Sequence, residues 1–489
     1  MLFNSLQFLI FFPIVVFLYY LIPFSKRWIL LLVASYYFYM CWRPEYIILI
    51  IVSTLIDYYA AIQMGKYSEK AKKKKFLLLS LFSNLGLLFA FKYFNFFNNS
   101  FNELFDSFNI MYNVPTFNLL LPVGISFYTF QTLSYSIDVY KGKKEPEKHL
   151  GIFAVYVSFF PQLVAGPIER STTLLPQFRK KISPNYNNIT DGLKLMMWGF
   201  FKKIVIADRL AVVVNNVYNN VHDHNSLSYT IATLFFAFQI YCDFSGYSDI
   251  AIGASQVMGY NLMDNFKRPY YSKNIAEFWR RWHISLSTWF KDYLYIPLGG
   301  NRVSKARIYF NLYLTFLISG IWHGANWTFV MWGSLHGFYL IFGKITYNFR
   351  TYLSQKIFNH KFNNFRQYFN IITTFILVCF AWIFFRANNL SDGFYIIKNI
   401  LLNSTSLLDI SSYKETFATL GLETYELVIA FVSIILLETF HLLQRHQSIR
   451  HMLRDKPLAI RWSIYFALIL LVLLWGYSSE QAEFIYFQF

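Results

Sequence analysis

The feature that most constrains this chain is the recurrence of long apolar stretches, which begin at 8–22 and continue to 464–475. A helix needs roughly 20 mainly apolar residues to cross a bilayer. Of all residues 56% are hydrophobic and only 14% are charged, and no polar section is long enough for a soluble domain. The sequence therefore predicts an all-α polytopic membrane protein of about ten transmembrane helices, forming a single domain over 1–489.

Positive charge is concentrated in short loops between the apolar stretches. Lys and Arg number 44 against 26 Asp and Glu, a formal net charge of +18. Cytoplasmic loops carry such an excess and contact anionic lipid headgroups. Membrane lipid, and not nucleic acid, is therefore the partner that the charge indicates.

The loop charges also predict the topology. They place 25–27 and 65–75 on the cytoplasmic side and 41–45 outside, so the N-terminus is expected to be extracytoplasmic. The segment 1–24 lacks a basic n-region and a small-residue cleavage site. We therefore expect it to remain as a span and not to be removed as a signal peptide.

One apolar segment does not fit the pattern in which successive loops alternate between the two sides of the membrane. The segment 150–165 has basic sequence both before it, at 141–148, and after it, at 178–181, so we predict that it does not fully cross. Non-helical backbone at membrane depth is tolerated only where it is buried in protein or lines a watery cavity. The Pro and Gly of "FFPQLVAGPIER" at 159–170 fit such a re-entrant turn.

A second interruption is the polar insertion at 264–307. Its middle, 275–295, predicts one amphipathic helix at the interface or in a cavity. The apolar face holds Phe278, Trp282, Leu286, Trp289 and Tyr293, and the charged positions are Arg280, Arg281, Lys291 and Asp292. Further apolar segments lie at 309–322, 325–345, 370–386, 423–443 and 459–476, with a basic loop at 445–456.

Three of the ten histidines, His283, His323 and His336, lie where apolar helices are interrupted by Trp, Gly and Asn. An ionisable residue inside a membrane segment is functional by default, and histidine there can act as a general base for a hydroxyl nucleophile. The alternative is an interhelical hydrogen bond that only ties two spans together. The other seven lie in or beside polar loops and are expected to be solvated: His149, His222, His224, His360, His441, His446 and His451.

Other chemistries have weaker support. The sequence has no HExxH, GxSxG, P-loop or GxGxxG motif, and no Asp, Glu or Cys stands at ligand spacing beside His283 or His323, so no metal site is predicted. Asp243 and Asp249 could pair with Arg residues in a re-entrant turn or hold a cation, and pairing is favoured. The isolated cysteines predict neither disulfides nor a metal motif: Cys41, Cys242 and Cys379.

Four motifs resemble those of the membrane-bound O-acyltransferase family, and more narrowly its bacterial alginate and peptidoglycan O-acetyltransferase branch. They are "PQLVAGPIER", "YCDFSGYSDIAIG", "RRWHISLSTWFKDYLYIPLGGNR" and "SGIWHGANWTFVMWGSLHG". The likeness covers most of the chain, from "LFNSLQFLIFFP" through "FFRANNLSDG" to the closing "EFIYFQF". In combination these motifs are highly specific.

The resemblance implies a helical cage around a central tunnel, which the acyl donor enters from the cytoplasm and the acceptor from outside. The core motifs would lie at 159–345 and C-terminal helices at 370–489. His323 would be the catalytic histidine and His283 the second histidine, at a position where many members have Asn or Asp. The tunnel would be lined by Trp282, Trp322, Asn326, His336, Asp243, Gly166, Pro167, Glu169 and Arg170.

On that basis we expect His323 to accept the proton of a hydroxyl that attacks the carbonyl carbon of acetyl-CoA. His283, Trp282 or Asn326 could stabilise the oxyanion, and His283 could equally orient the donor. The branch also implies transfer across the bacterial inner membrane to an esterase-like extracytoplasmic transferase, which then acetylates a polysaccharide. A protein serine, the polysaccharide itself or a lipid-linked carrier could be the immediate acceptor, and alginate, peptidoglycan and cellulose remain open.

Two other classes of function remain compatible with buried histidines. A proton-coupled transporter or flippase of an envelope precursor would use them as a proton relay, but it would favour inverted repeats and paired broken helices. The sequence has no internal repeat. The third class is a non-catalytic subunit of an envelope complex, and His323-dependent transfer from labelled acetyl-CoA separates the three.

Overall fold

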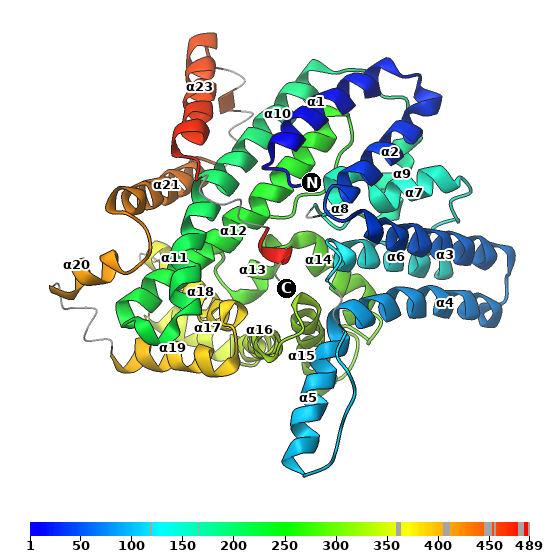
Figure 1. Ribbon diagram of the computed structural model, residues 1–489. Coiled ribbons are helices and arrows are strands. Elements are labelled where there is room, and N and C mark those ends of the chain that lie inside the picture. Colours follow the sequence, from blue (N-terminus) through cyan, green and yellow to red (C-terminus); the bar gives the residue numbers. More distant parts are fainter. Residues whose placement is uncertain are drawn as a thin grey trace. The chain divides into compact units, whose positions relative to one another are not determined.

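The structure, a computed structural model, describes residues 1–117, 120–164, 166–357, 363–403, 411–444, 452–453, 456–477 and 484–487. Within these ranges the regular elements are helices, and no strand is present (Figure 1). The predicted all-α class is confirmed.

The residues group into two compact units. One unit holds Met1–Met196 with Ser248–Met263, and the other holds Met197–Tyr247 with Asp264–Phe489. Helices α10 (Tyr186–Phe200) and α12 (Ser226–Val257) each contribute residues to both units. The single domain over 1–489 stays a prediction.

Six helical stretches of the described chain are long and apolar enough to cross a membrane. They are Pro44–Lys66, Lys70–Ser107, Ser226–Val257, Asn364–Arg386, Thr424–Leu443 and Leu458–Trp475. The last, α23, has no buried residue, so lipid is the environment that suits its apolar surface. A shorter apolar helix, α1, covers Leu6–Leu21. The chain is therefore a polytopic membrane protein.

In the first unit, three helices lie side by side around a buried carboxylate (Figure 1). They are α3 (Ile47–Lys66), α4 (Lys70–Leu88) and α6 (Ile125–Tyr140). Asp57 of α3 is fully buried and accepts hydrogen bonds from Ser80 Oγ at 2.5 Å and Asn84 Nδ2 at 2.9 Å. Such polar contacts hold apolar helices together in a defined arrangement.

Helix α4 is followed by a π-helical segment, η3 (Phe89–Tyr93), and by α5 (Phe94–Ser107). The axis of α5 turns away from that of α4 at this point (Figure 1). An insertion into the regular ladder of helix hydrogen bonds is a common cause of such a kink.

The helix is interrupted within 150–165, while the prediction that this segment does not fully cross the membrane stays a prediction. Helix α7 (Leu150–Ser158) has nine residues, Phe159 has a ψ of 111°, and α8 (Phe160–Leu163) is a single turn. Nine helical residues extend about 14 Å, which is less than half of the roughly 30 Å hydrocarbon core. The predicted turn continues through residue 165, which lies outside the described residues.

In the second unit, α15 (Lys305–His323) packs along α16 (Trp327–Ile345), which also contacts α18 (Asn363–Arg386). Their bounds agree with the apolar segments predicted at 309–322, 325–345 and 370–386. The remaining α-helices of the described chain are α2 (Arg27–Met40), α9 (Ser171–Phe178), α11 (Asp208–Asn219), α17 (Tyr347–Ile357), α19 (Leu390–Leu402), α20 (Ser411–Ala418) and α21 (Thr424–Leu443). Most of the predicted basic loop at 445–456 lies outside the described residues.

The single amphipathic helix predicted over 275–295 is wrong. The segment forms α13 (Ile275–Arg281), α14 (Ile284–Phe290) and a π-helical turn, η7 (Lys291–Tyr295). The helix breaks because His283 has a φ of 41°, in the left-handed region that a right-handed helix excludes. The predicted face is nevertheless buried, since Phe278 and Leu286 are each 1% exposed.

Candidate active site

His323 is the last residue of α15, and it is buried. The helix stops there because Gly324 adopts an extended backbone. Asn326 then caps α16, since its side chain accepts a hydrogen bond from the Thr328 backbone N–H at 3.0 Å. The Asn326 amide also donates to the Asn388 carbonyl at 3.0 Å. Both polar ends of Asn326 therefore position the turn, and its contact with substrate stays a prediction.

Two glycines set the distance between α15 and α16 near this turn. A Cβ on Gly320 would lie 2.3 Å from the Phe329 carbonyl oxygen and 3.0 Å from the Gly333 Cα. No side chain fits into that space, so the two backbones touch. His323 follows Gly320 by less than one helical turn, and this contact therefore fixes where its imidazole lies.

His283 occupies the break between α13 and α14 and is fully buried. Its Nδ1 lies 3.1 Å from Asn265 Oδ1, which also accepts hydrogen bonds from the Ser285 backbone N–H at 3.2 Å and the Ser285 hydroxyl at 2.9 Å. An atom that accepts from a backbone N–H is the amide oxygen, so Nδ1 of His283 must carry the proton. The basic lone pair of the ring is then on Nε2.

Burial lowers the pKa of His283 to about 3. A neutral imidazole is therefore the form present near neutral pH. His283 can accept or donate a hydrogen bond in that form, but it is a weak proton acceptor.

The structure brings His283 and His323 together around two shared aromatic rings. The Trp322 ring centroid lies 5.0 Å from that of His323 and 6.3 Å from that of His283. The Tyr486 ring lies 5.6 Å from His323 and 6.4 Å from His283. Residues as far apart in the chain as His283 and Tyr486 thus border one aromatic-walled region, to which the C-terminal segment contributes.

His336 belongs to the same cluster of rings, behind Trp332. The Trp332 centroid lies 4.9 Å from both His323 and His336. The Trp279 indole N–H donates to His336 Nδ1 at 3.2 Å, so the proton of neutral His336 is on Nε2. This hydrogen bond joins α13 to α16. It is the kind of interhelical contact that was the alternative to a catalytic role for a buried histidine.

Trp282 lies one residue before His283 and is 1% exposed. Its ring lies 5.1 Å from that of Trp382 on α18 and 5.5 Å from that of Phe278. The aromatic layer around the buried histidines is therefore built from α13, α16 and α18, together with Trp282 itself.

The expectation that Asp243 pairs with arginine is wrong, because its partner is a lysine. Asp243 Oδ1 lies 2.9 Å from Lys203 Nζ, which also contacts Asp208 Oδ1 at 2.8 Å. Asp243 lies within the continuous helix α12, so it is not in a re-entrant turn. Sequence reasoning missed Lys203 and Asp208, although charged residues within the apolar stretch "FFKKIVIADRL" were a signal for them.

The motif residues Gly166, Pro167, Glu169 and Arg170 belong to the other compact unit. There, the Met263 backbone N–H donates to Glu169 Oε1 at 2.5 Å. Burial raises the pKa of Glu169 to about 7, and the Met263 hydrogen bond and the Arg170 charge oppose the shift. Their role as tunnel residues stays a prediction.

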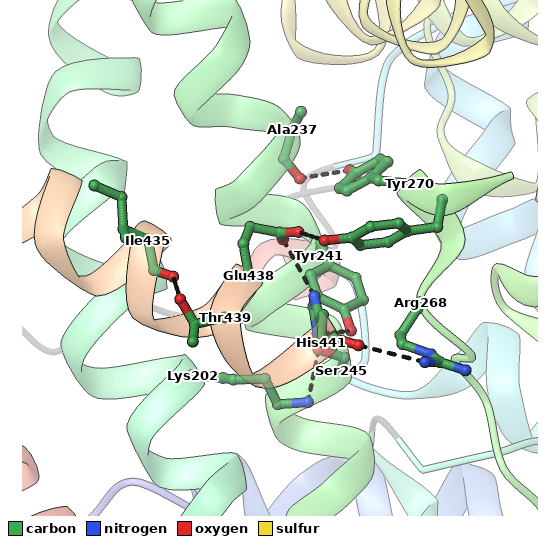
Figure 2. A network of polar contacts seen from close by, with 11 residues as sticks. Lys202, Ala237, Tyr241, Ser245, Arg268, Tyr270, Ile435, Glu438, Thr439 and His441 are labelled. Carbon is green, nitrogen blue, oxygen red and sulfur yellow. Dashed lines mark hydrogen bonds and ion pairs between the residues drawn. The ribbon is translucent and has the colours of Figure 1, made fainter. Parts of the chain in front are cut away.

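His441 was expected to be solvated, and this is wrong. It lies in α21, is 6% exposed, and contacts Tyr241 Oη through Nε2 at 3.1 Å and Glu438 Oε1 through Nδ1 at 3.2 Å (Figure 2). The Tyr271 hydroxyl donates to Glu438 Oε2 at 2.6 Å. Figure 2 shows Lys202 of the neighbouring helical segment donating to Ser245 beside this network. The network ties α21 to α12, and hydropathy alone could not reveal it.

Within the described residues, no group of three or more His, Cys, Asp or Glu side chains is placed to hold a metal ion. What the second unit provides is a pair of buried imidazoles with aromatic neighbours. Such a pair can bind a hydroxyl group, take its proton and orient a neighbouring carbonyl.

Comparison with known proteins gives a consistent result. Residues 46–388 match the profile of MBOAT, the membrane-bound O-acyltransferase family. The chain is 42% identical to the "Probable alginate O-acetylase AlgI" of Pseudomonas putida, over 80% of this chain and 78% of that protein. It is 34% identical to the "Peptidoglycan O-acetyltransferase" of Helicobacter pylori, over 95% of this chain and 92% of that protein. It is 28% identical to the "Teichoic acid D-alanyltransferase" of Bacillus subtilis, over 55% of this chain and 70% of that protein.

Proposed function

The chain belongs to the membrane-bound O-acyltransferase family, and from that premise we propose that it transfers an acetyl group from cytoplasmic acetyl-CoA to a hydroxyl acceptor. The observation that supports this most directly is the gathering of His323 and His283 around the rings of Trp322 and Tyr486. The names of the relatives, an alginate O-acetylase and a peptidoglycan O-acetyltransferase, support acetyl as the group and a polysaccharide as its destination.

His323 is the general base of the proposed reaction. It takes the proton of the acceptor hydroxyl while the oxygen attacks the thioester carbonyl carbon, and a C–O bond forms. Collapse of the tetrahedral intermediate breaks the C–S bond, and the imidazolium returns the proton to the thiolate. General base catalysis of this kind contributes about 10²- to 10⁴-fold, and the rest comes from holding donor and acceptor in line.

His283 has a different task, because burial lowers the pKa of its imidazole to about 3. Asn265 fixes its tautomer, so Nε2 carries the lone pair that can accept a hydrogen bond. We assign it the orientation of the hydroxyl or the donor through that hydrogen bond, and not proton removal. Stabilisation of the oxyanion by Trp282 and Asn326 is retained as a proposal.

The setting of the reaction is also a proposal. The protein lies in a bacterial inner membrane with its N-terminus outside, and the donor reaches the tunnel from the cytoplasm. The tunnel includes Gly166, Pro167, Glu169, Arg170, His336 and Asp243. An esterase-like extracytoplasmic transferase receives the acetyl group and modifies the polysaccharide. Alternatively, the polysaccharide accepts it directly.

The test is acetyl transfer by purified protein in detergent or nanodiscs, using acetyl-CoA labelled in the acetyl group. We expect transfer to an acceptor, or slow hydrolysis, that falls at least 100-fold in His323→Ala. His222→Ala is the matched control, because His222 is an exposed histidine of the same unit. If folded His323→Ala protein transferred acetyl groups at the wild-type rate, the catalytic assignment would be contradicted.

The same assay separates the other classes of function. A transporter or flippase would show no acetyl transfer, but would move its cargo in a proton-dependent way that requires the buried histidines. An assembly subunit would show neither activity.

A further inference from the structure

The C-terminal segment reaches the two histidines. Phe484 and Ile485 are 0% and 2% exposed, and Ile485–Phe487 forms a short helical turn, η10. Figure 1 shows this turn, in red, beside α13 and α14. The Tyr486 ring lies within 6.4 Å of both imidazole rings, so the position of the segment affects the shape of the active site.

One hydrogen bond fastens the backbone of this segment to α12. The Ile485 backbone N–H donates to Asp243 Oδ2 at 2.8 Å. The other carboxylate oxygen, Oδ1, lies 2.9 Å from Lys203 Nζ. The two oxygens of Asp243 therefore bind different partners, one the lysine and the other the segment that carries Tyr486.

The remaining contacts of Lys203 hold the carboxylate in place. Lys203 Nζ lies 2.8 Å from Asp208 Oδ1, and the three charged side chains are 1% to 4% exposed. Removing one member of a buried ionic group leaves an uncompensated charge and is strongly destabilising. The orientation of Asp243 is therefore well determined by the protein interior.

The backbone is adapted to this cluster. Lys203 lies in a π-helical segment, η4 (Phe201–Ala207), and both Lys202 and Lys203 are buried. A Cβ on Gly246 of α12 would lie 2.9 Å from the Gly199 carbonyl oxygen and 3.2 Å from the Lys203 nitrogen. The bare backbone at Gly246 thus lets α12 approach η4, and π-helical turns of this kind are frequent at functional sites.

We propose that Asp243 is a positioning residue that seats the C-terminal segment beside His323 and His283 by accepting the Ile485 backbone N–H, while Lys203 and Asp208 hold its carboxylate. Tyr486 then forms a fixed wall of the region between the two imidazoles. The inference rests on the proposed function in one respect: a displaced segment lowers acetyl transfer only if His323 and His283 carry out that transfer.

The test compares two full-length triple variants that both lack the charges of the cluster. Each carries Lys203→Met and Asp208→Asn, and they differ only in Asp243→Asn or Asp243→Leu. Neutral replacements of buried ion groups are often well tolerated. Asn keeps a carbonyl oxygen for the Ile485 N–H, whereas Leu is similar in size and has none.

Seating of the segment is measured by maleimide labelling of Ile485→Cys in a Cys41→Ser background, because Cys41 is exposed and the other two cysteines are buried. We expect labelling at least tenfold faster in the triple variant with Asp243→Leu than in the triple variant with Asp243→Asn. Asp264→Ala is the control for loss of an ion pair, since the Asp264–Lys267 pair is exposed, and it should leave the labelling rate unchanged. Equal labelling rates for the two triple variants would overturn the proposal.

Acetyl transfer is measured on the same proteins without the added cysteine. We expect kcat/KM of the variant carrying Asp243→Leu to fall at least tenfold below that of the variant carrying Asp243→Asn. Faster labelling with equal transfer would overturn the positioning role. His323→Ala tests the proposed function separately, because it should abolish transfer and leave the labelling of Ile485→Cys slow.

Discussion

At the scale of single residues, the protonation of His283 is coupled to the stability of the fold. His283 is held by Asn265 and is fully buried, and burial lowers its pKa to about 3. A group whose folded-state pKa is depressed in this way favours unfolding below its ordinary pKa, because only the unfolded chain takes up the proton. Acid should therefore destabilise the protein through His283.

The corresponding prediction compares the wild type with His283→Asn. Between pH 7 and pH 5, the free energy of unfolding of the wild type should fall by about 2 kcal/mol because of this residue. The variant should not show this contribution to the loss of stability. Asn keeps an N–H for Asn265 and tolerates the left-handed backbone. Thermal unfolding in detergent at several pH values measures the difference. His222→Asn is the control, and an equal pH dependence of stability for wild type and His283→Asn would mean that folding does not lower the pKa of His283.

At the scale of helices, the spacing of α15 and α16 determines where His323 lies. Gly320→Ala would place a Cβ 2.3 Å from the Phe329 carbonyl oxygen, so the helices must separate. Overpacking of this kind costs about 1–3 kcal/mol, and we expect acetyl transfer to fall at least tenfold because the imidazole moves. Transfer kinetics and thermal unfolding of the purified variant measure both effects.

Gly343→Ala in α16 provides the control for that prediction. Its Cβ would meet only Arg350 Nη2, at 3.7 Å. Alanine is the better helix former by roughly 1 kcal/mol, so this variant should be as stable as wild type or more stable, with normal transfer. A Gly320→Ala protein as active as Gly343→Ala would show that close helix contact is not needed.

The helices also show what could be predicted from the sequence. Apolar length located α15 and α16 to within four residues and the end of α18 at Arg386, although α18 begins seven residues before the predicted start. Flanking charge together with Pro and Gly located the break at Phe159. Periodicity correctly predicted that Phe278, Trp282 and Leu286 are buried. It could not predict the break at His283, because the group that stabilises this turn is Asn265, 18 residues earlier in the chain. The Lys203–Asp243 and Asp243–Ile485 contacts could not be predicted from the sequence for the same reason, since the second joins residues 242 positions apart.

At the scale of the whole molecule, the topology depends on which basic residues face the cytoplasm. Arg27 was counted as a loop charge, but it is buried, and its guanidinium donates to the Ile182 carbonyl at 2.6 Å and lies 4.6 Å from the Tyr19 ring. A buried arginine that is bound to protein groups is weaker evidence for a cytoplasmic loop than a solvated one. The cytoplasmic assignment of the first loop therefore depends on Lys26, which is exposed.

This leads to a prediction for the whole chain. Cysteines placed at Lys26 and Lys73 in a Cys41→Ser background should react with a membrane-impermeant maleimide from the cytoplasmic side, and one at Asn99 from outside. Lys73 lies in the first turn of α4 and Asn99 lies in α5, within one helical stretch, Lys70–Ser107. Helix α4 alone has 19 residues and extends about 28 Å, close to the roughly 30 Å thickness of the hydrocarbon core. Intact spheroplasts report labelling from outside, and inverted vesicles report labelling from the cytoplasmic side. Lysed membranes confirm that each cysteine can react. Labelling of Lys73→Cys and Asn99→Cys from the same side would contradict the predicted topology. Helix α4 would then lie along the membrane, and the basic segment 65–75 could not mark the cytoplasmic face from which we propose that the acyl donor enters.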